Sequence, residues 1–315
     1  MKILVIGGAG YIGSHVTYEL CDYGYDVTVL DNLSTGFIDN IDKRADFIKD
    51  TFSNLKNSHL LNDIDCVIHL AALKAAGESM DDPIKYSQHN LIDSIDLINL
   101  CIQNNVKSFI FSSSAAVYGI PKYLPIDEKH TTNPMNYYGF TKLIIEQELK
   151  WLSDLKGINV AFLRYFNAAG YDIQGRVTNK EKNPQNLLPI VMETASGIRK
   201  SMSVFGNDYN TPDGTCLRDY IHVNDLALGH VQAIEKLKYK KQITTNLATG
   251  NSHSVLDVIN MTKKITDKEI KFEIVSRRPG DPDSLYAKSN NILDYTNKYS
   301  DLKTIVKSMW DIYKK

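Results

Sequence analysis

The sequence has few cysteines, and no two of them stand at a metal-binding spacing. Its four cysteines, Cys21, Cys66, Cys101 and Cys216, are scattered over 315 residues. Disulfide scaffolds and structural zinc sites typically show close pairs such as Cys-x-x-Cys, so the sequence favours neither. We therefore expect reduced thiols and no metal site.

Long hydrophobic runs are also lacking. The apolar run at the start of the chain stops at Gly7, which is too short for the hydrophobic region of a signal peptide or for a membrane span. We therefore expect a cytoplasmic protein with no membrane partner.

Neither sign of charge is in excess. The chain has 36 basic and 37 acidic residues, a formal net charge of -1, and no prominent basic cluster. A nucleic-acid partner would be held by neutralising its phosphates, so none is expected. Hydrophobic residues make up 43% and charged residues 23%, as in an ordinary globular protein.

The first half of the sequence alternates short β-branched runs with longer amphipathic stretches. This alternation is typical of a parallel sheet wrapped by helices, whose strands are apolar throughout because both faces are covered. We predict an α/β fold with a doubly wound, Rossmann-like parallel sheet. The predicted strands are Lys2–Ile6, Asp26–Leu30, Asp46–Ile48, Cys66–Leu70, Phe109–Ser112 and Asn159–Leu163. The predicted helices of this half are Ile12–Asp22, Pro83–Asn104 and Tyr138–Leu155.

The rhythm changes near Gly170, and the last third is expected to form a smaller α/β lobe. The polar stretch Asp172–Gln185 contains glycine and proline and is predicted to be a long loop. We divide the chain into domains over residues 1–168 and 169–315, with a soft boundary that strands returning to the main sheet would cross. The helices predicted for the second part are Asn186–Ser196, Val223–Lys236, Ser254–Lys264 and Leu302–Lys314.

A glycine-rich turn follows the first predicted strand. Gly7, Gly10 and Gly13 allow a tight turn and close backbone approach, so that a pyrophosphate can lie at the positive end of the next helix. Asp31 follows the second strand, where a carboxylate would bind the adenosine ribose hydroxyls and repel a 2′-phosphate, which favours NAD over NADP. The alternative is a structural turn followed by an unrelated surface acid. The spacing Gly-x-x-Gly-x-x-Gly resembles the extended branch of the short-chain dehydrogenase/reductase superfamily.

A serine, a tyrosine and a lysine form the predicted catalytic set. Ser112–Ser114 closes a predicted strand, and ligands bind at the carboxyl edge of open α/β sheets. Tyr138 and Lys142 lie one turn apart on one helix face. An adjacent ammonium and a positive nicotinamide ring would both lower the tyrosine pKa from its usual value of ~10. Ser114 would hold the reacting oxygen beside the phenol. A surface Tyr–Lys pair with an ordinary strand-end serine is the alternative, and Tyr137, which has no lysine four residues on, is expected to pack.

Segments across nearly the whole chain resemble the UDP-glucose 4-epimerase family. They are residues 7–15, 31–34, 69–74, 112–119, 164–167 and 214–222. The resemblance implies an isomerase of carbohydrate metabolism that interconverts UDP-galactose and UDP-glucose by transient oxidation at sugar C4, with Tyr138 as base and NAD retained. It also implies homodimers formed by the helices near Pro83–Asn104 and Tyr138–Leu155, although those helices could equally be ordinary sheet covers.

The resemblance also assigns residues to both ligands, so that residues 1–168 become the predicted NAD-binding domain and residues 169–315 the predicted UDP-sugar-binding lobe. The implied cofactor contacts are Gly7, Gly10, Tyr11, Ile12, Gly13, Asp31, Asn32, Ser34, Asp50, Thr51, Leu70, Ala71, Lys74, Ser112, Tyr138, Lys142 and Phe166. The implied substrate contacts are Lys74, Ser114, Tyr138, Asn167, Asn186, Leu187, Ser203, Val204, Phe205, Arg218, Arg278, Asp281 and Leu285. Arg218 and Arg278 also make sense unaided because a diphosphate needs cationic, bidentate partners, while surface ion pairs are their alternative.

Other activities remain open on the same scaffold. Dehydratases of this branch resemble one another in an Asp-Glu pair after the serine motif, where this sequence has Ala115-Ala116, so dehydration would lack its acid and base. A reductase would need net cofactor turnover, and a redox sensor has no use for the catalytic set. The main alternative is a bifunctional or N-acetylhexosamine 4-epimerase.

Leu285 bears on that alternative. Relatives restricted to UDP-glucose and UDP-galactose can carry tyrosine at this position, and relatives that also accept N-acetylhexosamines carry a smaller residue. The resemblance implies that this side chain walls the space around the sugar C2 substituent. We expect UDP-galactose to be preferred and UDP-N-acetylgalactosamine to be turned over more weakly, unless Leu285 is simply a core residue.

Overall fold

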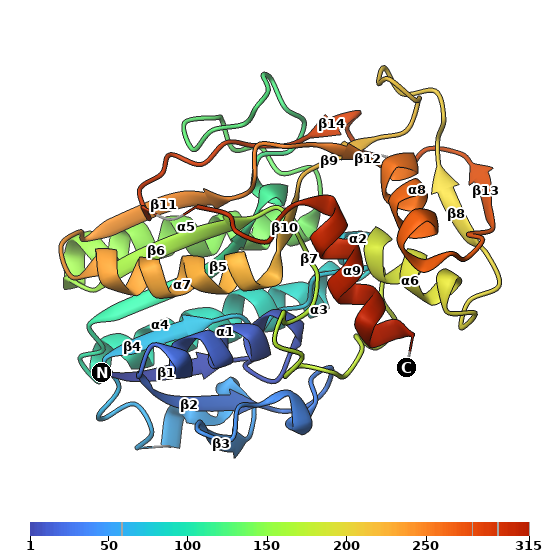
Figure 1. The fold of residues 1–315 in the computed structure, drawn as a ribbon. Coiled ribbons are helices and arrows are strands. Elements are labelled where there is room, and N and C mark those ends of the chain that lie inside the picture. The colour runs from blue at the N-terminus through green and yellow to red at the C-terminus, as the bar shows by residue number, and fades with distance from the viewer. Residues whose placement is uncertain (58, 279, 295, 315) are drawn as a thin grey trace.

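A seven-stranded parallel sheet forms the centre of the computed structural model, which describes residues 1–57, 59–278, 280–294 and 296–314 (Figure 1). The strand order is β11-β6-β5-β4-β1-β2-β3. Ile6 at the end of β1 pairs with Leu30 of β2 and His69 of β4, so the carboxyl ends of these strands meet at one edge. The strands are β1 (Lys2–Ile6), β2 (Asp26–Asp31), β3 (Asp46–Lys49), β4 (Cys66–His69), β5 (Ser108–Ser114), β6 (Asn159–Tyr165) and β11 (Gln242–Leu247).

Helices cover both faces of this sheet, which explains why most of its strands are apolar throughout. Helices α1 and α7 pack on one face, where Val16 and Leu226 meet Val5 and Leu163 of the sheet. Helices α4 and α5 pack on the other face in a second apolar cluster. The helical elements around the sheet are α1 (Tyr11–Asp22), η1 (Ile38–Asn40), η2 (Phe52–Asn57), α2 (Ala76–Asp81), α3 (Pro83–Tyr86), η3 (Ser87–Ile92), α4 (Asp93–Gln103), η4 (Ala115–Val117), α5 (Tyr137–Lys156) and α7 (Val223–Leu237).

A smaller lobe lies to one side of the sheet, with its own core between three helices and a short strand (Figure 1). Ser254 and Asp257 form a capping box that fixes the start of one of these helices, α8. The helices are α6 (Leu187–Ala195), α8 (Val255–Thr266) and α9 (Leu302–Tyr313). Three small sheets complete this part of the molecule: β7 (Asn167–Ala169) with β10 (Tyr220–His222); β9 (Leu217–Arg218) with β12 (His253–Ser254) and β14 (Ser284–Leu285); and, within the lobe itself, β8 (Met202–Phe205) with β13 (Phe272–Val275).

The predicted fold class is confirmed, and the predicted strands and helices occur at the predicted places. The stretch Pro83–Asn104 is helical as predicted, but it is divided into α3, a π-helical turn at η3, and α4. Such π turns insert an extra residue into a helix and are frequent at functional sites. The segment Asp172–Gln185 is irregular, as predicted for a loop.

Strand β11 was not identified from the sequence. Its residues, Gln-Ile-Thr-Thr-Asn-Leu, are too polar to read as a buried strand, and they pair with β6 at one edge of the sheet. Helix α7, which precedes β11, packs against α1. Residues on both sides of position 168 therefore build the main sheet and its cover, and the division into domains stays a prediction.

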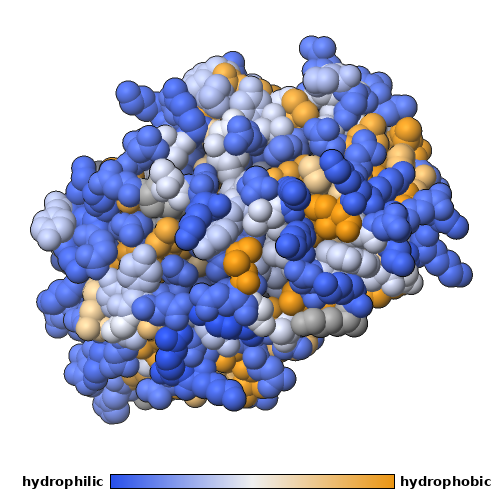
Figure 2. Space-filling model, viewed as in Figure 1, coloured by the Kyte–Doolittle hydropathy of each residue, from blue (hydrophilic) through white to orange (hydrophobic). Residues whose placement is uncertain are grey.

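The face of the molecule drawn in Figure 2 is mostly hydrophilic, with hydrophobic residues in small separate groups. Across the parts of the chain that the structure describes, no helix combines the length and the apolar character that a membrane crossing requires.

Candidate active site

The glycine-rich turn joins β1 to α1 at the carboxyl edge of the sheet. Gly7 has a φ of 83°, in the left-handed region that favours glycine. A Cβ atom at Gly13 would lie 2.1 Å from the Gly7 carbonyl oxygen, so only glycine fits there. Helix α1 begins at Tyr11, and its positive N-terminal end faces the turn. These features fit the pyrophosphate of a dinucleotide.

Asp31 is fixed beside this turn by the backbone. Its Oδ2 atom accepts a hydrogen bond of 3.0 Å from the Ala9 N–H, and its Oδ1 atom accepts one of 2.7 Å from the Leu33 N–H. Asp31 is buried, and its carboxylate keeps lone pairs for further donors. This position suits the adenosine ribose hydroxyls of NAD, as the sequence predicts.

The other predicted cofactor contacts follow the ends of neighbouring strands. Ala71 lies directly against Gly7, where a Cβ atom on the glycine would come 2.8 Å from the Ala71 nitrogen. Lys74 forms an ion pair with Glu181. The full set is Asn32 and Ser34 after β2, Asp50 and Thr51 after β3, Leu70, Ala71 and Lys74 after β4, Ser112 within β5, and Phe166 after β6.

The predicted catalytic set comes together between β5 and α5. Ser114 ends β5, and Tyr138 and Lys142 lie in the first turns of α5, whose start is capped by Asn136. The Lys142 ammonium donates a hydrogen bond of 2.8 Å to the Ser112 carbonyl oxygen and lies 5.8 Å from the centre of the Tyr138 ring. The Tyr138 hydroxyl lies near the Ser114 side chain, close enough for that hydroxyl to lower its pKa.

Burial has the largest effect on the pKa values of Tyr138 and Lys142. It raises the pKa of Tyr138, and the nearby Ser114 hydroxyl only partly opposes that rise. Burial also lowers the pKa of Lys142 to about 7. The expectation that the lysine would lower the tyrosine pKa is therefore not met in the protein alone. The Lys142 ammonium is directed to a backbone carbonyl, and desolvation of the phenol outweighs its charge.

A cavity of about 390 Å³ opens next to Ser114. Its wall carries two arginines: Arg218 pairs with Asp281 at 2.7 Å, and Arg278 stacks on Phe205 with its guanidinium carbon 3.9 Å from the ring centre. The cavity brings together these predicted substrate contacts: Ser114, Asn167, Asn186, Leu187, Ser203, Val204, Phe205, Arg218, Arg278, Asp281 and Leu285. Tyr138 does not line the cavity itself but lies near its lining residue Ser114, and Lys74 forms an ion pair with Glu181.

Asn90 was left out of the predicted site, yet it links the cofactor side to the catalytic helix. It lies in the π turn η3, and its amide exchanges hydrogen bonds of 3.0 and 2.9 Å with the Leu73 backbone N–H and C=O. The same amide donates to the Thr141 hydroxyl, at 3.3 Å. No pattern in the sequence marks this role, because the partners stand 17 and 51 residues away.

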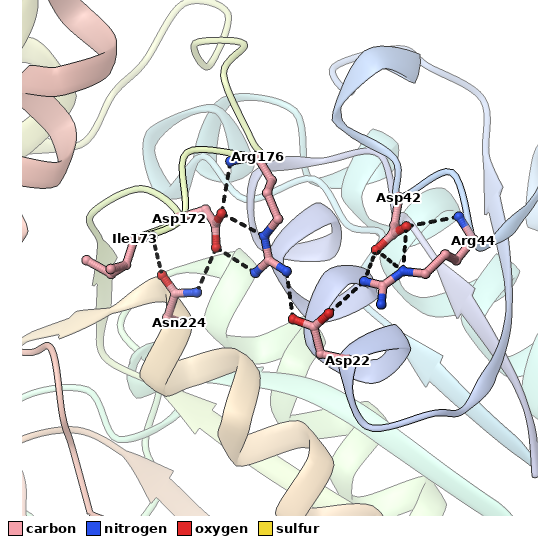
Figure 3. A network of polar contacts seen from close by, with 7 residues as sticks. All are labelled: Asp22, Asp42, Arg44, Asp172, Ile173, Arg176 and Asn224. Atoms are coloured by element: carbon pink, nitrogen blue, oxygen red, sulfur yellow. Dashed lines mark hydrogen bonds and ion pairs between the residues drawn. The ribbon is translucent and has the colours of Figure 1, made fainter.

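An ionic network anchors the long loop 172–185, which we call the strap (Figure 3). Arg176 binds Asp172 at 2.8 Å and reaches Asp22, the last residue of α1, at 2.6 Å. Asp22 is also bound by Arg44 at 2.7 Å, and Arg44 binds Asp42. A carboxylate at a helix C-terminus is unfavourable for the helix dipole, and the two arginines compensate for it.

Further along, the strap contacts loops on both sides of the glycine-rich turn. The Asn179 N–H and side-chain amide both donate to the Asn40 side-chain oxygen, at 3.1 and 3.0 Å. Glu181 pairs with Lys74. Asn40 lies between β2 and β3, and Lys74 follows β4, so these two loops flank the end of β1. The strap therefore links the two loops on either side of the glycine-rich turn.

Among the residues that the structure describes, no group of three or more His, Cys, Asp or Glu side chains is arranged to hold a metal ion.

Known proteins resemble this chain over its whole length. The model of the "NAD dependent epimerase/dehydratase family" matches residues 3–248. UDP-glucose 4-epimerase of Halalkalibacterium halodurans is 42% identical, in an alignment that covers 100% of this chain and 96% of that protein. The crystal structure of UDP-glucose 4-epimerase from Brucella ovis in complex with NAD has a TM-score of 0.95 and 39% identity, covering 99% of this chain and 98% of that one.

A second solved structure is that of UDP-glucose 4-epimerase from Bifidobacterium longum in complex with NAD⁺ and UDP. It has a TM-score of 0.93 and 37% identity, and the superposition covers 99% of this chain and 98% of that chain. Because the family model matches residues 3–248, the chain belongs to the NAD dependent epimerase/dehydratase family.

Proposed function

We propose that this protein is an NAD-dependent 4-epimerase that interconverts UDP-galactose and UDP-glucose by transient oxidation at sugar C4. The observation that carries the proposal is one cavity lined both by Ser114, which lies near Tyr138, and by Arg218 and Arg278. A sugar nucleotide needs both features, because its sugar hydroxyl exchanges a proton and its diphosphate needs cationic partners. The relatives named above act on, or are solved with, ligands of this chemistry.

The cofactor is held by the turn, by Asp31 and by the strand-end residues around them. When bound, NAD supplies a hydride acceptor that can return the hydride, together with a positive charge beside the catalytic set. Asp31 favours the ribose hydroxyls of NAD, and the strap contacts the loops on both sides of the glycine-rich turn. Because the reaction is redox-neutral, we expect the protein to retain its cofactor between turnovers.

Tyr138 is the proposed base. It takes the proton of the sugar 4-hydroxyl and gives it back on the other epimer, while Ser114 holds that oxygen in place. Since burial raises the pKa of Tyr138 in the protein alone, the ionised phenol depends on positive charge nearby. Lys142, with a pKa of about 7, supplies part of this charge when it is protonated.

Dehydration of the sugar is disfavoured by the cavity wall. Ala115 and Ala116 line the cavity after Ser114, and in the described part of the wall the single acidic residue is Asp281, which pairs with Arg218. No carboxyl group there is free to remove a C5 proton. A second candidate activity, 4-epimerisation of UDP-N-acetylhexosamines, is favoured by Leu285, because leucine in the wall leaves more room than tyrosine.

The direct test is to incubate the purified protein with UDP-galactose and no added cofactor, and to follow the appearance of UDP-glucose. We expect conversion to the same equilibrium mixture from either sugar nucleotide. If no conversion occurs with or without added NAD, the proposed function is wrong.

We further propose a homodimer formed through the helical stretches Pro83–Asn104 and Tyr138–Leu155. Ile84 on α3 is 81% exposed, and Trp151 on α5 is 68% exposed, with Phe140 and Leu155 of α5 also open. Large exposed apolar groups gathered on neighbouring helices suit a protein interface. By light scattering, we expect Trp151→Glu to shift a dimer toward monomer and Tyr239→Glu, an exposed aromatic after α7, to leave it intact. A monomeric wild type would contradict the dimer.

A further inference from the structure

Asp219 lies behind the cavity wall and is bonded to residues that form it. It joins β9 to β10 and is fully buried. Its backbone N–H donates to the Leu285 carbonyl oxygen at 3.2 Å. Its own carbonyl oxygen accepts from the Asn167 backbone at 3.1 Å and from the Asn167 side-chain amide at 2.8 Å. Leu285 and Asn167 both line the cavity, so one peptide unit on each side of Asp219 holds a wall residue.

The carboxylate of Asp219 gathers two more segments. Its Oδ1 atom accepts from the Thr249 N–H at 2.9 Å and from the Thr249 hydroxyl at 2.8 Å. Its Oδ2 atom accepts from the Gly250 N–H at 3.0 Å and, more weakly, from the Ala287 N–H at 3.5 Å. Residues 249 and 250 follow β11, and Ala287 comes two residues after Leu285. The carboxylate therefore ties the end of the main sheet to the segment that carries Leu285.

The residue type matters because every one of these donors points at Asp219. An ionised carboxylate only accepts hydrogen bonds, whereas an asparagine would turn an N–H₂ group toward some of the donors. Burial raises the pKa of Asp219 to about 6, and the hydrogen bonds from Thr249, Gly250 and Ala287 oppose that rise. A buried carboxylate is unfavourable in itself, so its presence here indicates that fixing these segments matters.

We propose that Asp219 is a positioning residue for the sugar-facing wall, which holds Leu285 and Asn167 at a fixed separation and so sets the discrimination between substituents at sugar C2. The inference rests on the proposed function, in which Leu285 borders that space. Strand β14 pairs Leu285 with Arg218 of β9, and this pairing does not involve the Asp219 carboxylate. Without the carboxylate, the wall would keep this pairing but lose the hydrogen bonds from Thr249, Gly250 and Ala287.

Asp219→Asn is the test variant, because it keeps the shape and removes acceptors. Asp225→Asn is the matched control. Asp225 is also buried, at 1% exposed, and its carboxylate accepts from the Lys298 and Tyr299 N–H groups at 2.9 Å and from the Ser300 hydroxyl at 2.5 Å. The control thus makes the same change in an equivalent environment, with partners that do not form the cavity wall.

The measurements are kcat/KM for UDP-galactose and for UDP-N-acetylgalactosamine, and the Kd of UDP alone. In Asp219→Asn we expect kcat/KM for UDP-galactose to fall on the order of tenfold, because reacting groups tolerate little displacement. We expect a smaller fall for the bulkier sugar, so that the preference for UDP-galactose drops about fivefold. The Kd of UDP should change less than about twofold, since UDP lacks the sugar. Asp225→Asn should lower stability but leave the preference unchanged.

An unchanged preference in Asp219→Asn, or an equal change in both variants, would overturn the inference. If Asp219→Asn does not fold, Thr249→Val removes one donor to the same carboxylate, and a preference equal to that of the wild type would then overturn it. If the wild type turns over neither sugar, the proposed function fails. In that case, the binding of UDP-galactose and of UDP to Asp219→Asn tests the role of Asp219 separately. We expect the substitution to weaken UDP-galactose binding more than UDP binding, and equal weakening would overturn the inference.

Discussion

At the scale of single residues, Tyr138 is where binding and chemistry can be separated. Replacing Tyr138 by phenylalanine removes the proposed base and keeps the ring. We expect kcat to fall by ~10²–10⁴-fold, the usual contribution of an acid–base group, with UDP affinity and NAD content nearly unchanged. Steady-state kinetics, UDP calorimetry and the nicotinamide content of acid-denatured protein measure these effects.

Tyr137 is the control for this substitution. It precedes Tyr138, and its hydroxyl bonds the Ser87 hydroxyl at 2.6 Å, away from Ser114. Tyr137→Phe should keep most of the activity. Near wild-type turnover in Tyr138→Phe would show that another group is the base.

Leu285 gives a second prediction at this scale. Leu285→Tyr should reduce kcat/KM for UDP-N-acetylgalactosamine by ~10–100-fold and change UDP-galactose little, because the added ring fills the space for the acetamido group. Leu285→Met, which conserves volume, should leave the ratio between the two sugars near its wild-type value. Equal losses on both sugars in Leu285→Tyr would mean that this side chain does not limit the C2 space.

Which residues the sequence could identify depends on the distance between partners along the chain. Tyr138 and Lys142 stand one helical turn apart, and the glycines surround one turn, so these local spacings, taken together with Ser114 and the flanking strands and helices, predict their roles. Asp219 and Asn90 act through partners that only the fold brings near, such as Ala287 for Asp219 and Thr141 for Asn90. Single-sequence patterns carry no trace of such pairs.

At the scale of elements, the strap 172–185 connects the loops that flank the glycine-rich turn to the end of α1. Arg176→Ala removes its main anchor, so we expect faster loss of NAD during dialysis and a fall of about 2 kcal/mol in the free energy of unfolding. Arg44→Ala is the control, because Arg44 binds the same Asp22 but is half exposed and lies outside the strap. Its effect on NAD release should be clearly smaller. Equal NAD loss from both variants would contradict a role for the strap.

The pH dependence of this anchor has a definite sign. Burial tends to raise the pKa of Asp172, but the hydrogen bonds and charge of Arg176 outweigh it and lower the pKa from 3.8 to about 2. A lowered carboxyl pKa stabilises the folded state above the unfolded value, and the stabilisation is lost as the pH falls from about 4 to about 2. In urea unfolding, the wild type and Arg176→Ala should therefore differ at pH 6 and converge toward pH 2. A constant difference over this range would rule out the ionic contribution.

The elements also show where prediction from sequence stops. Strands β1, β2, β4, β5 and β6 contain buried apolar runs from which a strand can be predicted. Strand β11 was missed because two threonines and an asparagine interrupt its apolar residues, and a polar partner such as Tyr118, which donates to the Asn246 side chain, is distant in the sequence. Strands β7, β9, β10 and β14, which contribute to the cavity wall, have only two or three residues each. They are too short to show the alternation of apolar and polar residues from which a strand is predicted.

At the scale of the whole molecule, the carboxyl edge of the sheet brings the predicted cofactor contacts next to the cavity that holds the predicted substrate contacts. The glycine-rich turn and Asp31 lie at the ends of β1 and β2, while the arginine-lined cavity lies where β6 and β7 meet the smaller lobe. Ser114, at the end of β5, stands between them in the strand order. Ligands of open α/β sheets bind at this edge, and in the proposed function it would bring the sugar C4 within reach of the cofactor.

The central claim is that the sugar is oxidised and reduced at C4 within one molecule, and an isotope label tests it most directly. UDP-galactose carrying deuterium at C4 should be converted to UDP-glucose with the deuterium still at C4. The same reaction of unlabelled substrate in heavy water should introduce none there. Loss of the label to solvent, or entry of solvent deuterium at C4, would show that the carbon exchanges a proton, and would contradict the account.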